Sequence, residues 1–169
     1  MTAVFVLAIA GWIAGEARLT VLDQPSPGTL ALPTGLLVLA SHALGLCTGG
    51  GGSWWGAALL GGGIALRLAA IRSLGASFTS ALGSEALIVR GPYRLARHPS
   101  ELGLWAILFG GAWLLGSWWA AAAAIAVVPL SVLRCAREDA ALACHPEHAA
   151  WGRRVGWFAP RIGRGDATR

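Results

Sequence analysis

The sequence predicts an all-α integral membrane helical bundle with about five transmembrane helices, a cytoplasmic loop that carries the chemistry and an interfacial C-terminal segment. Of its 169 residues 56% are hydrophobic and the mean hydropathy is +0.62, which is far more apolar than a soluble domain of this size. The apolar residues gather in five long runs. Because no linker-like segment interrupts these runs, residues 1–169 are expected to form a single domain.

The five apolar runs approach the length of about 20 residues that a helix needs to cross a bilayer. We expect spans at about residues 1–22, 30–47, 54–71, 101–115 and 118–133. A turn is expected at residues 23–28, and a tight hairpin at residues 116–119. Pro129 is expected to kink the fifth span, which should continue as a helix to about residue 142.

The basic residues predict how the protein sits in the membrane. All 13 are arginines, and most of them lie in the polar connection of residues 72–100 and in the tail after residue 133. By the positive-inside rule these two segments are cytoplasmic and the N-terminus is outside, as in a bacterial-type inner or plasma membrane. The net charge of +5 is therefore interpreted as orientation in the bilayer and not as a signal for nucleic acid.

Residues 90–103 are the first candidate site, because they place arginines and a histidine between two prolines. Each proline disfavours the α region for the residue before it, so breaks in the backbone are expected at Gly91 and His98. Pro99 suits the first position of a helix. The free N–H groups and the positive dipole end of that helix should then lie beside Arg97 and His98, an arrangement that favours anions.

The tail holds the second candidate site, in which Glu138 and Asp139 lie on the expected continuation of the fifth helix. Arg134 and Glu138 are four residues apart and could pair on one helical face. The aromatic residues around 151–158 indicate a segment that lies on the bilayer surface. His145 and His148 are expected to bind no metal, since no further ligand accompanies them.

With these residues in view, the C-terminal half resembles the isoprenylcysteine carboxyl methyltransferase family and its phospholipid methyltransferase relatives. The resemblance covers about residues 73–160, after the N-terminal spans of residues 1–72. Its first part is Leu74-Gly75 with Phe78, Gly91-Pro92-Tyr93-Arg94, Arg97-His98-Pro99 and Gly103. Its second part is Arg134, Glu138-Asp139, Leu142, Trp151, Val155, Phe158 and Pro160. The chain departs from the pattern at Glu101, where the family usually has tyrosine, and at residues 145–148, where a Phe-Gly…Tyr pattern is common.

The resemblance implies an enzyme that binds S-adenosylmethionine at the cytoplasmic face, between the fourth and fifth helices. The residues that it implies for the cofactor are Tyr93, His98, Pro99, Gly103, Glu138 and Asp139. Arg97 and Arg134 would orient an anionic acceptor, and Glu101 is a third candidate for a catalytic role. No metal is implied, and the partners are the bilayer and a lipophilic or prenylated substrate.

The chemistry favours a carboxylate as the methyl acceptor. Methyl transfer from a sulfonium to a carboxylate neutralises both charges, so a dry site at a membrane surface favours it. A carboxylate is already ionised at neutral pH, whereas an amine must lose a proton to a base such as Glu101 or His98. We therefore expect carboxyl O-methylation of an isoprenylcysteine-like substrate. The alternatives are methylation of a phospholipid amine or a small thiol, an NADPH-dependent reductase of the sterol reductase type, and a non-catalytic membrane protein.

Overall fold

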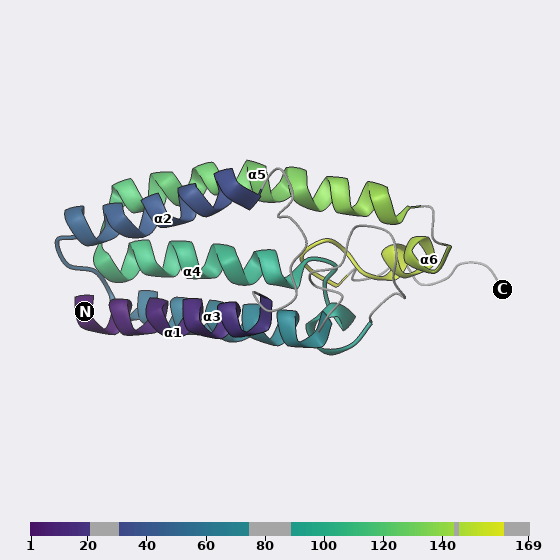
Figure 1. Cartoon of the computed structure of the whole chain (residues 1–169), viewed down its shortest axis with the longest axis horizontal. Helices are drawn as coiled ribbons and strands as arrows, with labels where there is room; N and C mark the ends of the chain where they lie inside the picture. The colour runs from purple at the N-terminus through teal and green to yellow at the C-terminus, as the bar shows by residue number, and fades with distance from the viewer. Residues whose placement is uncertain (21–30, 75–88, 144–145, 161–169) are drawn as a thin grey trace.

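The computed structural model describes residues 1–20, 31–74, 89–143 and 146–160. Within these ranges the chain is helical, which confirms the all-α prediction for the described residues. The elements are α1 (Thr2–Thr20), α2 (Ala31–Thr48), α3 (Trp54–Leu74), the 3-10 helix η3 (Gly91–Arg94), α4 (Pro99–Leu115), α5 (Trp118–Leu142) and α6 (Pro146–Arg154). The five long helices lie side by side in an elongated bundle, and α6 lies beyond one of its ends (Figure 1). The expected turn at residues 23–28 lies outside the described residues.

Two of the helices, α3 and α5, are long and apolar enough to cross a membrane by length and composition. The remaining long helices contain shorter apolar stretches, at Thr2–Gly15, Leu36–Thr48 and Pro99–Leu115. Large apolar side chains also point outward from the bundle, with Leu7 73% and Ile125 61% exposed, which suits lipid better than water. Five spans and their orientation stay predictions.

Glycines let α3 and α4 approach to backbone contact. Gly56 and Gly63 of α3 face Gly110 and Gly103 of α4, so that the two antiparallel pairs lie two helical turns apart. A Cβ atom added at Gly63 would lie 2.7 Å from the backbone nitrogen of Ile107, which is closer than real Cβ atoms come. Close contacts of this kind between small residues are a common way to join helices in a membrane. These four residues are called the glycine seam below.

The hairpin between α4 and α5 is confirmed. Gly116 ends α4 with φ = 67°, a left-handed conformation that glycine adopts without strain. Ser117 caps α5, because its Oγ accepts a hydrogen bond from the Ala120 backbone N–H at 3.2 Å. The hairpin makes α4 and α5 antiparallel, so the start of α4 and the end of α5 lie at the same end of the bundle (Figure 1).

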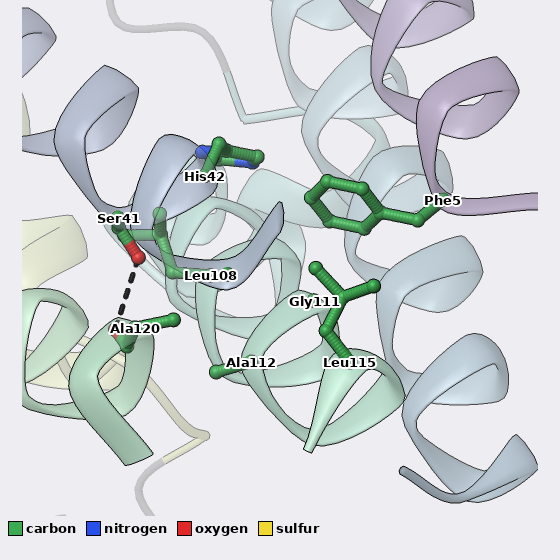
Figure 2. A pocket seen from close by; sticks show the side chains of 9 residues that line it. Phe5, Ser41, His42, Leu108, Gly111, Ala112, Leu115 and Ala120 are labelled. Carbon is green, nitrogen blue, oxygen red and sulfur yellow. Dashed lines mark hydrogen bonds between the residues drawn. The ribbon is translucent and has the colours of Figure 1, made fainter. Parts of the chain in front are cut away.

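Helices α1 and α2 contact each other through an aromatic stack. The ring of His42 stacks on Phe5 and Trp12 at centroid distances of 5.5 and 6.0 Å, and its Nδ1 lies 2.6 Å from the Val38 carbonyl oxygen. A shallow pocket lies beside this stack, between α1, α2, α4 and α5 (Figure 2). On α4 its lining begins at Leu108, which is more than two turns from the first residue of that helix.

Some element boundaries agree with those expected and others differ. The fourth helix begins at Pro99, the first helical position that the sequence predicted, two residues before the expected membrane span. The fifth helix runs from Trp118 to Leu142, so its predicted continuation to about residue 142 is confirmed; Pro129 lies inside it, and the kink stays a prediction. The tail forms α6 up to Arg154, although no helix was predicted there.

The glycine seam generates a stability prediction with a control on the same helix. Gly63→Ala should destabilise the protein by about 1 to 3 kcal/mol, because the new methyl group meets the α4 backbone. Gly62→Ala is the matched control: a Cβ atom there meets nothing within 4 Å, so stability should stay within about 1 kcal/mol. Unfolding of both variants in detergent measures the difference. Equal stabilities would contradict the seam.

Candidate functional site

The site lies at the end of the bundle where η3, the start of α4, the end of α5 and α6 meet (Figure 1). Both predicted breaks are confirmed there. Gly91 has φ = 57°, and His98 has φ = −124° and ψ = 58°, which is outside the α region. Pro92 and Pro99 each stand in the first turn of the helix that follows the break. The breaks turn the chain so that Arg97 and His98 face the end of α5.

The carboxylate of Asp139 is the centre of the site. Its Oδ2 accepts a hydrogen bond from Arg97 Nη1 at 2.6 Å, and its Oδ1 lies 3.2 Å from Nε2 of His98. The same Oδ1 lies 3.8 Å from Nε2 of His148, which comes from α6. The Asp139 side chain is only 15% exposed. Both of its oxygens are therefore engaged by neighbouring side chains.

Glu138, the adjacent carboxylate, has a different environment. Its side chain is 40% exposed, and its Oε2 lies 3.8 Å from Nδ1 of His98, whose own side chain is 6% exposed. The buried imidazole thus lies between an engaged carboxylate, Asp139, and an open one, Glu138. Of the two acidic residues that the sequence singled out, Glu138 has the more exposed carboxylate.

The chain after α6 folds back onto the Arg-His-Pro turn. The backbone N–H groups of Arg97 and His98 donate to the carbonyl oxygens of Gly156 and Trp157, both at 3.0 Å. The ring of Trp157 meets the His98 ring edge-on at 5.8 Å and lies 5.9 Å from the Arg97 guanidinium. The tail therefore fixes both the backbone and the side chains of the turn.

Glu101 and Arg134 form a second cluster, between α4 and α5. The Glu101 side chain is 4% exposed; its Oε2 accepts a hydrogen bond from Ser131 Oγ at 2.6 Å, and its Oε1 lies 3.4 Å from Arg134 Nη1. The possible pairing of Arg134 with Glu138 is thus not the one observed, because Arg134 reaches across to α4. Arg134 itself remains 41% exposed. It offers a positive charge that is held in place by a buried carboxylate.

Tyr93 lies beneath the first turn of α4. Its side chain is 6% exposed, and the Ser100 side chain lies beside its hydroxyl. Burial raises the pKa of this hydroxyl well above its ordinary value, and the negative charge of Glu138 raises it further. The backbone carbonyl of Ser100 accepts a hydrogen bond from the buried Arg67 of α3 at 3.2 Å. Tyr93 and Arg67 therefore support the turn that begins α4.

The structure thus brings together four of the nine predicted site residues, namely Arg97, His98, Glu138 and Asp139. Glu101 and Arg134 form the neighbouring cluster, Pro99 begins α4, and Tyr93 lies below it. Gly103 belongs to the glycine seam and faces α3. The motif residues Gly75 and Phe78 lie outside the described residues.

Sequence reasoning missed His148 as part of the site, along with Ser131 and Arg67. No spacing in the sequence marked His148, because its contact with Asp139 depends on where α6 packs. Among the described residues, no group of three or more His, Cys, Asp or Glu side chains is arranged to hold a metal ion.

The environment of Tyr93 generates a prediction about alkaline pH. The pKa of Tyr93 is raised in the folded state, so its contribution to stability is complete below about pH 10 and is lost as the pH rises above that value. Tyr93 is the only tyrosine in the sequence, so tyrosinate absorbance reports on it alone. We expect ionisation near pH 10 in urea-unfolded protein and only at higher pH in folded protein. Coincident titrations would contradict the burial.

The part of the chain that carries the site matches a known protein family. The family model described as phospholipid methyltransferase matches residues 52–144, which is more than half of the chain and runs from the start of α3 to the end of α5. A comparison with curated proteins finds no match. The matched segment contains the Arg-His-Pro turn, Glu138 and Asp139, and it agrees with the resemblance inferred from the motifs. The chain therefore belongs to the phospholipid methyltransferase family, a group of membrane methyltransferases.

Proposed function

We propose that the protein transfers the methyl group of S-adenosylmethionine to the carboxylate of a lipophilic, isoprenylcysteine-like acceptor. The observation that carries this proposal is the juxtaposition of a buried imidazole, His98, with the open carboxylate of Glu138 where α4 begins and α5 ends. S-adenosylmethionine carries an ammonium group and ribose hydroxyls, which need hydrogen-bond acceptors, and a carboxylate, which needs donors. S-adenosylmethionine supplies an electrophilic methyl group on a sulfonium.

The residues around the Arg-His-Pro turn fit the polar parts of this cofactor. Glu138 can accept hydrogen bonds from ribose hydroxyls or an ammonium group. A neutral His98 ring can accept one from either group through its unprotonated nitrogen. Arg97 Nε and Trp151 Nε1 are buried and have no hydrogen-bond partner among the described residues. Because buried donors are normally paired, these two are suited to meet the carboxylate of a bound ligand. Tyr93, Pro99 and Gly103 would act by shaping the turn and its helix.

Arg134 is the group best placed to orient an anionic acceptor. It lies four residues before Glu138 on α5, which is about 6 Å along the helix axis. Its guanidinium is partly exposed while Glu101 holds one nitrogen. A carboxylate bound at Arg134 would therefore lie close to a cofactor bound at Glu138, and holding two reactants in place can supply about 7 to 11 kcal/mol of barrier lowering.

The surroundings of Glu101 favour a carboxylate over an amine as the acceptor. An amine would need a base, and Glu101 was one of the two candidates for that role. Both of its oxygens are engaged in the structure, by Ser131 and Arg134. A carboxylate needs no base. Family membership favours methyl transfer over the reductase alternative.

The two ends of the bundle support the proposed orientation. Exposed tryptophans mark the end opposite the site, at Trp54, Trp55, Trp113, Trp118 and Trp119. Arginines mark the site end, and Figure 1 shows the N-terminus at the tryptophan end. Tryptophan is enriched at membrane interfaces and arginine on the cytoplasmic side. We infer that the site and the C-terminus are cytoplasmic and the N-terminus is outside.

Transfer of a labelled methyl group from S-adenosylmethionine to a panel of acceptors tests the function. The panel contains an S-prenylated cysteine, its carboxyl amide, a phosphatidylethanolamine and a small thiol. We expect label in the prenylated acid and none in its amide. Label in the phospholipid alone would show that the acceptor is an amine and not a carboxylate. Label in the thiol alone would show that the protein is a thiol methyltransferase.

Glu138→Gln and His98→Ala should each weaken the binding of S-adenosylhomocysteine by at least about tenfold, because each removes a charged or polar partner of the ligand. Glu147→Gln is the control, since Glu147 is an exposed glutamate of α6. Calorimetric titration of the three purified variants measures the affinities. Unchanged affinity in both site variants would remove the cofactor from this position.

Arg134→Ala should lower kcat/KM for a carboxylate acceptor by about 10- to 100-fold and leave cofactor affinity near that of the wild type. The matched control is Arg137→Ala, because Arg137 is an exposed arginine on the next turn of α5. Arg134→Lys keeps a positive charge beside Glu101, so it separates loss of the guanidinium from loss of protein stability. A loss confined to cofactor affinity would place Arg134 in the cofactor site.

A further inference from the structure

We propose that His148 is a positioning residue of the site: it holds Asp139 from α6, and Asp139 in turn orients Arg97 and His98. This inference rests on the proposed function for its catalytic meaning. The contact itself is independent of any ligand. It also gives α6 a role beyond lying at the membrane surface.

The carboxylate of Asp139 has a partner at each of its oxygens. Its Oδ2 is taken by Arg97 at 2.6 Å, and its Oδ1 is shared by the imidazoles of His98 at 3.2 Å and His148 at 3.8 Å. The His148 side chain is 7% exposed and that of Asp139 is 15% exposed. Arg97 and His98 come from the turn before α4 and His148 comes from α6, so two segments contact the carboxylate from different sides. Because Arg97 and Asp139 are mostly shielded from water, the attraction between their charges is only weakly screened.

One face of α6 is shaped to fit this cluster. Trp151 and Gly152 lie three and four residues after His148, which places both on the same helical face as the histidine. The Trp151 ring packs edge-on against the His148 ring at 5.4 Å. A Cβ atom at Gly152 would lie 3.3 Å from Arg97 Nη1, so glycine leaves room for the guanidinium. The histidine therefore faces the carboxylate while the glycine faces the arginine.

This arrangement assigns different tasks to the two acidic residues. Arg97 and His98 lie in a turn, where side chains need external support to keep one geometry. Asp139 supplies that support from α5, and His148 limits the rotation of Asp139. Glu138 stays open for the ligand. Removing His148 should loosen Arg97 and His98 together without removing any group that touches the cofactor.

The first test uses the apo protein, which has only four histidines. Nitrogen-15 spectra of the imidazole rings, assigned by single His→Gln variants, are recorded with and without Asp139→Asn. We expect the ring signals of both His98 and His148 to move and that of His42, which contacts Phe5 and Trp12 instead, to stay in place. A change at His98 alone would overturn the proposal.

The second test is a double-mutant cycle in the affinity for S-adenosylhomocysteine. His148→Phe keeps an aromatic ring beside Trp151 but loses the polar contact, and it should weaken binding about 3- to 10-fold. His148→Gln, which keeps an N–H donor, should recover part of the loss. Arg153→Gln, an exposed change on the same helix, should have no effect.

Coupling distinguishes positioning through Asp139 from an unrelated structural role. In the Asp139→Asn background, His148→Phe should cause no further loss of affinity. Fully additive losses would show that His148 acts elsewhere and would overturn the proposal. A wild-type protein that binds no S-adenosylhomocysteine would instead refute the proposed function, and the ring spectra would still decide whether His148 holds Asp139.

Discussion

The carboxylate of Asp139 joins the parts of the chain that make up the site. It receives Arg97 and His98 from the turn before α4 and His148 from α6, while it is itself carried by the last turns of α5. The turn before α4 is thus joined to α5 and α6 by one largely shielded carboxylate, whose charge is paired with Arg97. The preceding residue of the same helix, Glu138, remains open, and it is the carboxylate that we propose for the ligand.

The site depends on the helix pair that presents it. The glycine seam fixes α4 against α3, and Arg67 of α3 continues the contact by donating to the Ser100 carbonyl in the first turn of α4. Tyr93 fills the space below the same turn. In lipid there is little hydrophobic force between helices, so close packing and buried hydrogen bonds must supply the rigidity. The position of His98 therefore depends on the packing of α3 against α4.

The sequence predicted local features better than contacts. Pro92 and Pro99 restrict the residue before each of them, and Gly116 itself adopts the left-handed conformation of a turn, so both breaks and the hairpin could be predicted from single residues. The partner of Arg134 could not, because Glu138 at helical spacing and Glu101 on another helix were equally compatible with the sequence. His148 was missed for the same reason: its role depends on where α6 packs. Of the five predicted spans, α3 and α5 are long and apolar enough to cross a bilayer, and the other three contain shorter apolar stretches, so five spans stay a prediction.

The most direct test of the account is calorimetric titration of the purified wild-type protein with S-adenosylhomocysteine, beside NADPH as the competing ligand. We predict saturable binding of S-adenosylhomocysteine at one site per chain and no heat from NADPH. Binding of NADPH alone would contradict the account, because a reductase would then use the turn formed by Arg97 and His98 and the assignment of Glu138 to a methyl donor would fall.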